Sequence, residues 1–454
     1  MVGIGGIGMS AIADLLLARG YNVSGSDIVV SPVVTRLLAS GVRVFKGHAA
    51  SHIGETDLVV VSSAIPDNNQ ELLEAKKRKI PIIGRGALLA ELARGKRTVA
   101  VAGSHGKTTT TAMITFVLEA AGLDPTAVIG GVVSAFGSNT KQGQGEFMVV
   151  ESDESDRSFL CLTPEVAILT NVDDEHLDAY GGIEELEQAF ETFVMRVPAT
   201  GWIVACVDDP RLINIVARCP RRAVTYGIDA DEASVRADDV ELGPTGSTCR
   251  VTVATDTVAG EIILSLAVPG RHNLRNALAA VAAAACLGIE PRVAGEALGC
   301  FTGVERRFQC YRAPCGIDVI DDYGHHPTEI AAVFETVRLS QPRRLIVLFQ
   351  PHRFTRISRL IDRFGEVLAQ SDLLVLTDVY AASEEAIDGA DSPSLAEAVR
   401  KHRAITVELA DDLDDAVARV ARAANPGDVV VVLGAGSVGK LAPRVVEALT
   451  REGV

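Results

Sequence analysis

The sequence contains little that would suit a membrane or a nucleic-acid surface. No apolar run among the 454 residues approaches the roughly 20 residues that span a bilayer. The longest, Ala277 to Ile289, is rich in alanine and is interrupted by Gly288. The net charge of −16 disfavours contact with phosphate backbones, and an aromatic content of 4% disfavours an aromatic recognition surface. We therefore expect a globular protein with no membrane and no nucleic-acid partner.

The eight cysteines are scattered and form no Cys-x-x-Cys pair, which argues against a zinc site. The chain does not begin with a basic and apolar leader that ends in a small-residue cleavage site. Reduced thiols and a cytoplasmic location are therefore expected. The sequence leaves the oligomeric state open between a monomer and a homodimer.

Short β-branched runs alternate with helical patterns along nearly the whole chain, which predicts parallel sheets covered by helices and hence an α/β protein. The polar, glycine-punctuated stretch from Gly227 to Pro269 predicts a small antiparallel extension. The length suits about three domains, and two seams place them at residues 1–95, 96–302 and 303–454. The predicted strands are Leu58–Ser62, Thr98–Ala102, Phe147–Glu151, Val166–Asn171, Leu345–Phe349, Leu373–Thr377 and Val429–Leu433.

The most informative segment is a glycine-rich turn, Gly103-Ser-His-Gly-Lys107-Thr-Thr, between a predicted strand and a helical pattern from Ala112. Backbone amides of such a turn, together with the following helix N-terminus, bind phosphate oxygens. Lys107 supplies charge for the β- and γ-phosphates, and the Thr108 hydroxyl is placed to ligate Mg²⁺. Val101 stands where the usual motif has its first glycine. We expect an ATP-using enzyme rather than a plain turn with a surface lysine.

A second glycine loop lies at the start of the chain, where Gly3, Gly5 and Gly8 follow the Gly-x-Gly-x-x-Gly pattern and Asp27 comes 19 residues later. This spacing is typical of an NAD site, although any nucleoside diphosphate can use the same loop. Only two residues precede Gly3, which predicts either a truncated start or a rudimentary first strand.

A third loop begins at Gly434 and also matches the dinucleotide pattern. Only 15 residues follow its last glycine, Gly439, so an acidic ribose partner cannot follow at the usual distance. We interpret this loop as a tight turn from a strand into a helix.

Polar clusters directly follow several predicted strands. Carboxylates from Glu151 to Asp156 come after one strand, and His176 lies in an acidic segment after the next. Open α/β sheets bind ligands at the carboxyl ends of their strands, so Glu151 and His176 are candidate Mg²⁺ ligands near the phosphate loop. The alternative is a solvated acidic turn, which suits Glu154 and Asp156 better than Glu151.

Taken in order, the segments resemble the Mur ligases of bacterial peptidoglycan synthesis over essentially the whole chain. The resemblance implies a Rossmann-like domain that binds the UDP of the substrate, a central P-loop ATPase domain and a C-terminal domain of dinucleotide-fold type. It moves the first glycine loop from NAD to UDP. The motifs that carry it are Gly-Ile-Gly-Gly-Ile-Gly-Met-Ser, Gly-Ser-His-Gly-Lys-Thr-Thr-Thr, Glu-Ser-Asp-Glu-Ser-Asp, Asp-Asp-Glu-His-Leu-Asp, Gly-Arg-His-Asn, Glu-Arg-Arg-Phe, Asp-Asp-Tyr-Gly-His-His-Pro-Thr-Glu and Gln-Pro-His-Arg-Phe-Thr-Arg.

The resemblance implies an ATP-dependent ligase that joins L-alanine to the carboxylate of UDP-N-acetylmuramate through an acyl phosphate. ATP and Mg²⁺, the latter as two ions, are the implied cofactors. The nearest alternative is a recycling ligase that adds a tripeptide to the same sugar nucleotide. An NAD-dependent oxidoreductase and a non-catalytic nucleotide-binding regulator are rivals from other classes.

The resemblance also assigns roles residue by residue. The implied catalytic residues are Lys107, His176, His325, Arg353 and Arg356, and the implied metal ligands are Thr108, Glu151 and His176. ATP is expected to contact Gly103, Ser104, His105, Gly106, Lys107, Thr108, Thr109, Asn273, Asn276, Arg306 and Asp321. The UDP-substrate is expected to contact Gly5, Gly6, Ile7, Gly8, Met9, Ser10 and Asp27.

Overall fold

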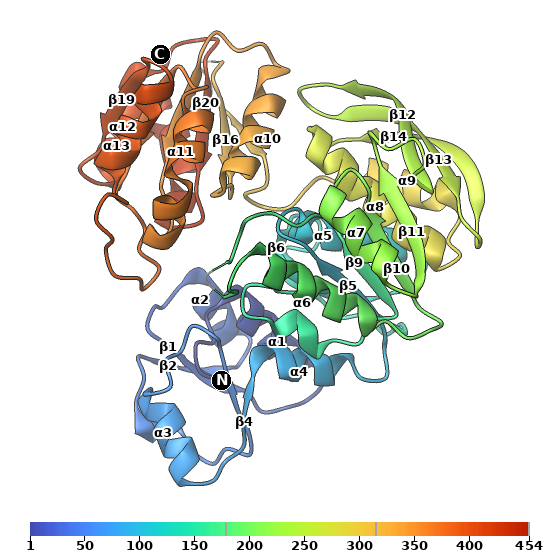
Figure 1. Cartoon of the computed structure of the whole chain (residues 1–454). Helices are drawn as coiled ribbons and strands as arrows, with labels where there is room; N and C mark the ends of the chain where they lie inside the picture. Colours follow the sequence, from blue (N-terminus) through green and yellow to red (C-terminus); the bar gives the residue numbers. More distant parts are fainter. Residues whose placement is uncertain (178, 314–315, 453–454) are drawn as a thin grey trace. The chain divides into compact units, whose positions relative to one another are not determined.

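In the computed structural model, which describes residues 1–177, 179–313 and 316–452, the chain forms two compact units (Figure 1). The first comprises Met1–Val240, Cys249–Ser265 and Arg275–Thr302, and the second comprises Glu241–Thr248, Leu266–Leu274 and the chain from Gly303 onward. Strands and helices alternate in both units, so the predicted α/β class is confirmed. None of the helices in the described ranges is both long and apolar enough to cross a lipid bilayer.

The first unit begins with four short strands that form two small parallel sheets. Val2 connects these sheets, because it pairs with Ser26 of β1 and with Val61 of β3. Val2 lies directly before the turn at Gly3. The elements are α1 (Ile7–Ala18), β1 (Ser24–Asp27), α2 (Pro32–Ala39), β2 (Arg43–Lys46), η1 (Ala50–His52), β3 (Val59–Val61), α3 (Gln70–Lys77), β4 (Ile82–Gly84) and α4 (Arg85–Ala93).

The largest sheet has ten strands in the order β14-β13-β12-β11-β10-β9-β5-β8-β6-β7. Strands β8 and β9 run parallel to β5 on its two sides, and almost all side chains of these three strands are buried. Neighbouring strands β12 and β13 are joined by residues 243–246, which is too short for a parallel crossover, so the predicted antiparallel extension is confirmed.

Helices cover this sheet, and Figure 1 shows α6 and α7 in front of the strands. Helix α8 is buried on all sides from Asn276 to Ala285, which explains its alanine-rich composition. The elements are β5 (Arg97–Ala102), α5 (Lys107–Ala120), β6 (Thr126–Val133), β7 (Ser138–Lys141), β8 (Phe147–Glu151), η2 (Ser158–Cys161), β9 (Val166–Leu169), α6 (Ile183–Met195), β10 (Trp202–Cys206), α7 (Pro210–Arg218), β11 (Arg222–Gly227), β12 (Val235–Leu242), β13 (Ser247–Ala254), β14 (Ala259–Leu266), α8 (Arg271–Cys286) and α9 (Pro291–Gly299).

The second unit is built on a six-stranded sheet in the order β15-β16-β20-β17-β18-β19. Only β15 is antiparallel to its neighbour, and separate hydrophobic clusters cover the two faces of the sheet. The elements are β15 (Gln309–Arg312), β16 (Asp318–Asp322), α10 (Pro327–Arg338), β17 (Leu345–Phe349), α11 (Phe354–Leu368), β18 (Leu373–Leu376), α12 (Ser392–His402), β19 (Thr406–Leu409), α13 (Leu413–Ala423), β20 (Val429–Leu433), η3 (Ser437–Lys440) and α14 (Leu441–Glu452).

Several helices begin at polar residues that cap their free backbone amides. Asp209 and Asp391 each accept a hydrogen bond from the first turn of a helix that has proline near its start. At α10 a capping box forms, in which His326 accepts from Thr328 N and Glu329 accepts from His326 N. These local signals fix where the chain leaves a strand end and enters a helix, which is where the candidate site lies.

We expect Phe159→Ala to destabilise the first unit by about 3–5 kcal/mol, because it removes a large aromatic ring from a packed core. Phe159 is fully buried, and its ring centroid lies 5.4 Å from that of Phe190 and 5.1 Å from that of Phe193. Fluorescence of Trp202, the only tryptophan and a buried residue of β10, reports the unfolding in urea. The control is Cys161→Ala at an exposed position of η2. A loss below about 1 kcal/mol would contradict this core assignment.

Candidate active site

The phosphate loop lies at the carboxyl end of buried strand β5 and leads into α5, which begins at Lys107. The helix therefore starts earlier than its apolar pattern indicated. Gly106 caps the helix with a φ of 80°, a left-handed conformation that favours glycine. At Gly103 an added Cβ would collide with Thr170 Oγ1. Both glycines are thus required by the backbone, as expected of a loop whose amides face a phosphate.

The end of β9 holds this loop in place through direct hydrogen bonds. Thr170 Oγ1 donates to His105 O over 2.6 Å, and His105 N donates to Asn171 Oδ1 over 2.8 Å. Ser104 N donates to Asn171 O over 3.0 Å. The His105 ring is fixed as well, since its Nε2 lies 3.0 Å from Asp173 Oδ2. The predicted ATP-binding residues Ser104 and His105 are therefore rigidly placed.

Lys107 is neutralised by Glu154. Lys107 Nζ donates to Glu154 Oε1 over 2.7 Å, to Gly103 O over 2.6 Å and to Ser104 O over 3.1 Å. Burial alone would lower the pKa of Lys107, but the Glu154 carboxylate raises it, so the side chain is an ammonium. Burial raises the pKa of Glu154, whereas the Lys107 charge at 2.7 Å lowers it and favours the ionised carboxylate.

The acidic segment Glu151–Asp156 is not a solvated turn, so that interpretation of Glu154 and Asp156 was wrong. The Glu154 side chain is only 1% exposed, and Tyr180 Oη donates to the Glu154 carbonyl over 2.6 Å. Asp156 accepts from Arg85 over 3.0 Å and is 16% exposed. A short run of charged residues does not show whether a turn is solvated or buried, because the residues that form ion pairs with it come from distant parts of the chain.

Glu151 and Thr108 form a compact set of oxygen atoms beside the phosphate loop. Thr108 Oγ1 donates to Glu151 Oε1 over 3.0 Å, and Gly130 N donates to Glu151 Oε2 over 2.6 Å. A hydroxyl and a carboxylate from neighbouring strand ends are the hard oxygen ligands that Mg²⁺ prefers. The donor set therefore fits the predicted metal.

His176 lies near the same acidic segment. Its Nε2 is 3.9 Å from Glu154 Oε1 and 3.7 Å from Glu175 Oε1, and its φ of 57° is left-handed. Within the described part of the chain, Glu154 Oε2 is buried without a hydrogen-bond partner. An imidazole and a buried carboxylate oxygen thus occupy one region, which suits a cation. The sheet brings His176 and Glu151 to the same edge, as their positions after strands predicted.

The two asparagines at the start of α8 have different surroundings. Thr110 Oγ1 donates to Asn276 Oδ1 over 3.2 Å, and an added Cβ on Gly106 would lie 2.5 Å from that oxygen. Asn276 therefore lies directly against the phosphate loop. Asn273 Nδ2 donates to Pro269 O over 2.7 Å and stabilises the entry into the helix.

The first glycine loop is shaped by Asp27. Gly5 N donates to Asp27 Oδ2 over 2.8 Å, so the carboxylate that spacing assigned to the ligand also supports the loop backbone. Helix α1 begins at Ile7, and its N-terminus suits an anionic group. Met9 and Ser10 are buried, whereas Gly6 and Ile7 of the same segment are exposed.

In the second unit, Arg306 joins three segments. Its Nε lies 3.4 Å from Asp321 Oδ1, its Nη2 donates to Gly434 O over 2.5 Å, and its guanidinium carbon lies 5.1 Å from the Tyr323 ring centroid. Burial raises the pKa of Asp321 to about 6, against the effect of Arg306. Gly434 lies in the turn after β20, which agrees with the interpretation of the third glycine loop as a turn from a strand into a helix.

The remaining predicted residues of this unit gather around His352, which lies just after β17. The His325 and His352 ring centroids are 5.7 Å apart, and His352 stacks on Tyr380 at 5.4 Å. Arg356 Nη1 donates to His352 O over 3.0 Å, and the neighbouring Arg353 is the N-cap residue of α11. No sequence pattern points to Tyr380, because it lies in an irregular segment between β18 and α12.

Arg85 is a further residue that the sequence did not single out. It is the first residue of α4, and Nη2 of its guanidinium donates to Asp153 Oδ2 over 2.8 Å. A single arginine after an ordinary strand gives no pattern, and its importance follows only from its distant partners.

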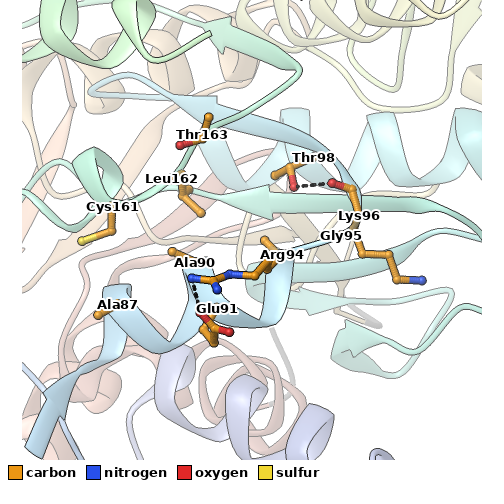
Figure 2. A pocket seen from close by; sticks show the side chains of 11 residues that line it. Ala87, Ala90, Glu91, Arg94, Gly95, Lys96, Thr98, Cys161, Leu162 and Thr163 are labelled. Carbon is orange, nitrogen blue, oxygen red and sulfur yellow. Dashed lines mark hydrogen bonds and ion pairs between the residues drawn. The ribbon is translucent and has the colours of Figure 1, made fainter. Parts of the chain in front are cut away.

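A separate pocket of about 420 Å³ opens between α4 and the residues that follow η2 (Figure 2). Glu91 and Arg94 form an ion pair of 2.8 Å beside it, and Lys96 and Thr98 line it where the chain passes from α4 into β5. None of the residues to which the sequence assigned a role lines this pocket. It lies at the connection between two parts of the first unit rather than at the phosphate loop.

Comparison with known proteins identifies relatives along the whole chain. The chain is 48% identical over 452 residues to UDP-N-acetylmuramate–L-alanine ligase of Solibacter usitatus (strain Ellin6076), covering 99% of this chain and 95% of that protein. The corresponding ligase of Anaeromyxobacter dehalogenans (strain 2CP-1) is 48% identical over 454 residues, with 99% and 97% covered. The crystal structure of UDP-N-acetylmuramate–alanine ligase from Thermotoga maritima matches with a TM-score of 0.84 and 29% identity, over 99% of this chain and 98% of that one.

Family models agree with these relatives. Residues 1–97 match the Mur ligase family catalytic domain, residues 101–284 the Mur ligase middle domain, and residues 306–436 the Mur ligase glutamate ligase domain. The three-domain organisation expected from the sequence is thus confirmed. With matches in all three parts and relatives 48% identical over nearly its full length, the chain belongs to the Mur ligase family.

Proposed function

We propose that this protein joins the carboxylate of UDP-N-acetylmuramate to the amine of L-alanine and converts ATP to ADP and phosphate. The observation that supports this proposal is the 48% identity, over 99% of the chain, to a ligase named for this reaction. Further relatives at 45–46% identity bear the same name. The tripeptide-adding alternative and the NAD-dependent oxidoreductase are therefore not retained.

The chemistry explains why a phosphate loop is needed. A carboxylate lacks a leaving group, so its oxygen first attacks the γ-phosphorus of ATP, and the bond from that phosphorus to the bridging oxygen of ADP breaks. The alanine nitrogen then attacks the carbonyl carbon of the acyl phosphate, phosphate leaves, and the amine loses a proton. Lys107 and the amides of its loop offset the charge on the transferring group.

We assign Thr108, Glu151 and His176 to Mg²⁺, two ions being expected. Support comes from the oxygen pair at Thr108 and Glu151 and from the buried Glu154 oxygen near His176. When bound, Mg²⁺ supplies positive charge to the phosphates and to the reacting carboxylate. The chain's own contribution is to hold these side chains at adjacent strand ends, where they need little rearrangement.

In the second unit we assign the amino-acid end of the reaction to His325, Arg353 and Arg356. The two arginines suit carboxylates. His325 Nδ1 lies 3.1 Å from Tyr323 O, which favours a proton on Nδ1 and leaves Nε2 as the basic nitrogen for the alanine ammonium.

The other assignments follow the motifs. We place ATP at residues 103–109, Asn273, Asn276, Arg306 and Asp321, and the UDP group at residues 5–10 and Asp27. We keep the domain limits 1–95, 96–302 and 303–454, and we expect a monomer or a homodimer that acts in the cytoplasm.

We expect phosphate release from ATP to require both UDP-N-acetylmuramate and L-alanine. The same assay with the L-alanyl-γ-D-glutamyl-diaminopimelate tripeptide, or without an acceptor, should give background rates. Calorimetry should detect UDP-N-acetylmuramate binding but no NAD binding, because we assign the first glycine loop to the UDP group of the substrate. Faster release with the tripeptide, or micromolar binding of NAD, would refute the proposed function.

Lys107→Ala should lower turnover by roughly 10²–10³ or more, because one well-placed charge in the transition state is worth that much. Rates are measured per folded molecule, with Trp202 fluorescence to confirm folding. Lys141→Ala is the matched control, since this half-buried lysine also forms ion pairs, with Glu119 and Asp124, but lies outside the loop. Near-normal turnover of folded Lys107→Ala would reject the phosphate-loop assignment.

Glu154→Gln should destabilise the first unit by about 3–5 kcal/mol, because it leaves the Lys107 ammonium buried without a counter-charge. Adding Lys107→Met to this variant should recover part of the loss. Mg-ATP should raise the melting temperature of Glu154→Gln more than that of the unchanged protein, since the phosphates replace the missing charge. The control is Glu119→Gln, which removes one partner of the half-buried Lys141 at an exposed glutamate. Equal stability of Glu154→Gln and Glu119→Gln would contradict this account.

A further inference from the structure

Arg85 lies against the first glycine loop. An added Cβ on Gly8 would lie 2.5 Å from Arg85 Nη1 and 3.3 Å from Arg85 Cδ, so the arginine side chain packs directly on the Gly8 backbone. Gly8 is in the first turn of α1, whose N-terminus attracts anions. One nitrogen of the guanidinium therefore faces the loop to which we assign the UDP group.

The other terminal nitrogen of Arg85 faces the acidic segment Glu151–Asp156. Nη2 donates to Asp153 Oδ2 over 2.8 Å and to Asp156 Oδ2 over 3.0 Å. Among the described residues, the guanidinium forms these two hydrogen bonds, and Nη1 takes part in neither. Arginine suits this position because its planar fork can contact two groups in fixed directions, whereas the lysine ammonium is a point charge.

Asp153 is joined by one peptide bond to Glu154, and Glu154 holds Lys107 through the 2.7 Å ion pair. The start of α4 also contacts η2, which follows the acidic segment, because an added Cβ on Gly86 would collide with Ser158 Cβ. A short contact path therefore runs from Gly8 through Arg85, Asp153 and Glu154 to Lys107. All of these residues belong to the first unit.

We propose that Arg85 and Asp153 are positioning residues that couple the two nucleotide sites, so that a UDP-sugar at the first glycine loop and ATP phosphates at Lys107 bind cooperatively. This inference rests on the proposed function, which places a nucleoside diphosphate at Gly5–Gly8. The anionic diphosphate attracts Nη1 of Arg85, and the rigid guanidinium then changes the contact between Nη2 and Asp153. The adjacent Glu154 in turn changes its ion pair with Lys107. Coupling of this kind is reciprocal, because each ligand must change the affinity of the other by the same factor.

The test is calorimetric titration of the full chain with UDP-N-acetylmuramate and with Mg-β,γ-imido-ATP, each alone and with the other at saturation. In the unchanged protein each ligand should tighten binding of the other by about fivefold or more. Asp153→Asn should leave the affinity for each ligand alone within about threefold and reduce the coupling factor to near one. Arg85→Lys keeps the charge and the fold but loses the fork, so it should also abolish coupling.

Arg36→Gln is the matched control, because Arg36 forms a 2.7 Å ion pair with Asp14 in the same part of the unit and touches neither loop. It should keep the full coupling factor. Unchanged coupling in both Asp153→Asn and Arg85→Lys would overturn the inference, as would two ligands that bind the unchanged protein independently. Failure of the unchanged protein to bind UDP-N-acetylmuramate at all would instead refute the proposed function on which the inference rests.

Discussion

The buried ion pair between Lys107 and Glu154 is the interaction on which the candidate site depends. An ammonium placed at a phosphate loop must remain charged although most of its surroundings exclude water, and burial by itself would drive its proton off. Glu154 prevents this, and two backbone carbonyls of the loop complete the set of acceptors. The pair also ties the acidic segment to the loop, so their geometry is determined together.

The parallel sheet explains why these groups meet. Strand β5 carries the phosphate loop, its neighbour β8 leads into the acidic segment, and its other neighbour β9 leads to Thr170, Asn171 and His176. Parallel neighbours end at the same edge, so three segments separated by tens of residues deliver their side chains to one place. The buried strands supply rigidity, and the short segments beyond them supply the chemistry.

The second unit repeats this principle on its own sheet. Asp321 lies near the end of β16, His352 follows β17 and Gly434 follows β20, and these three strands are parallel neighbours. Arg306 links two of these strand ends, and the stacked pair of His352 and Tyr380 adds a third segment, after β18. In each case the functional segment lies at or just past the carboxyl end of a buried strand.

The sequence by itself determined the α/β class, the strands at the centres of both large sheets, the phosphate loop and the family. These features depend on local patterns: apolar runs of strand length, glycine spacing and motifs read in order. Local pattern also predicted that Glu151 and His176 share a sheet edge. It could not show that α5 begins at Lys107, because Thr108, Thr109 and Thr110 carry no helical apolar signal although all three are buried.

Only the tertiary structure decided which charged residues are buried and with which partners. A solvated turn was an open alternative for Glu154, and Arg85 had no pattern at all. In the structure Glu154 binds Lys107, and Arg85 binds Asp153 and Asp156, which are 68 and 71 residues away in the sequence. The physical reason is that the environment of an ionisable side chain is set by the distant segments that fold against it. A short window of sequence contains the charge but not the group that neutralises it.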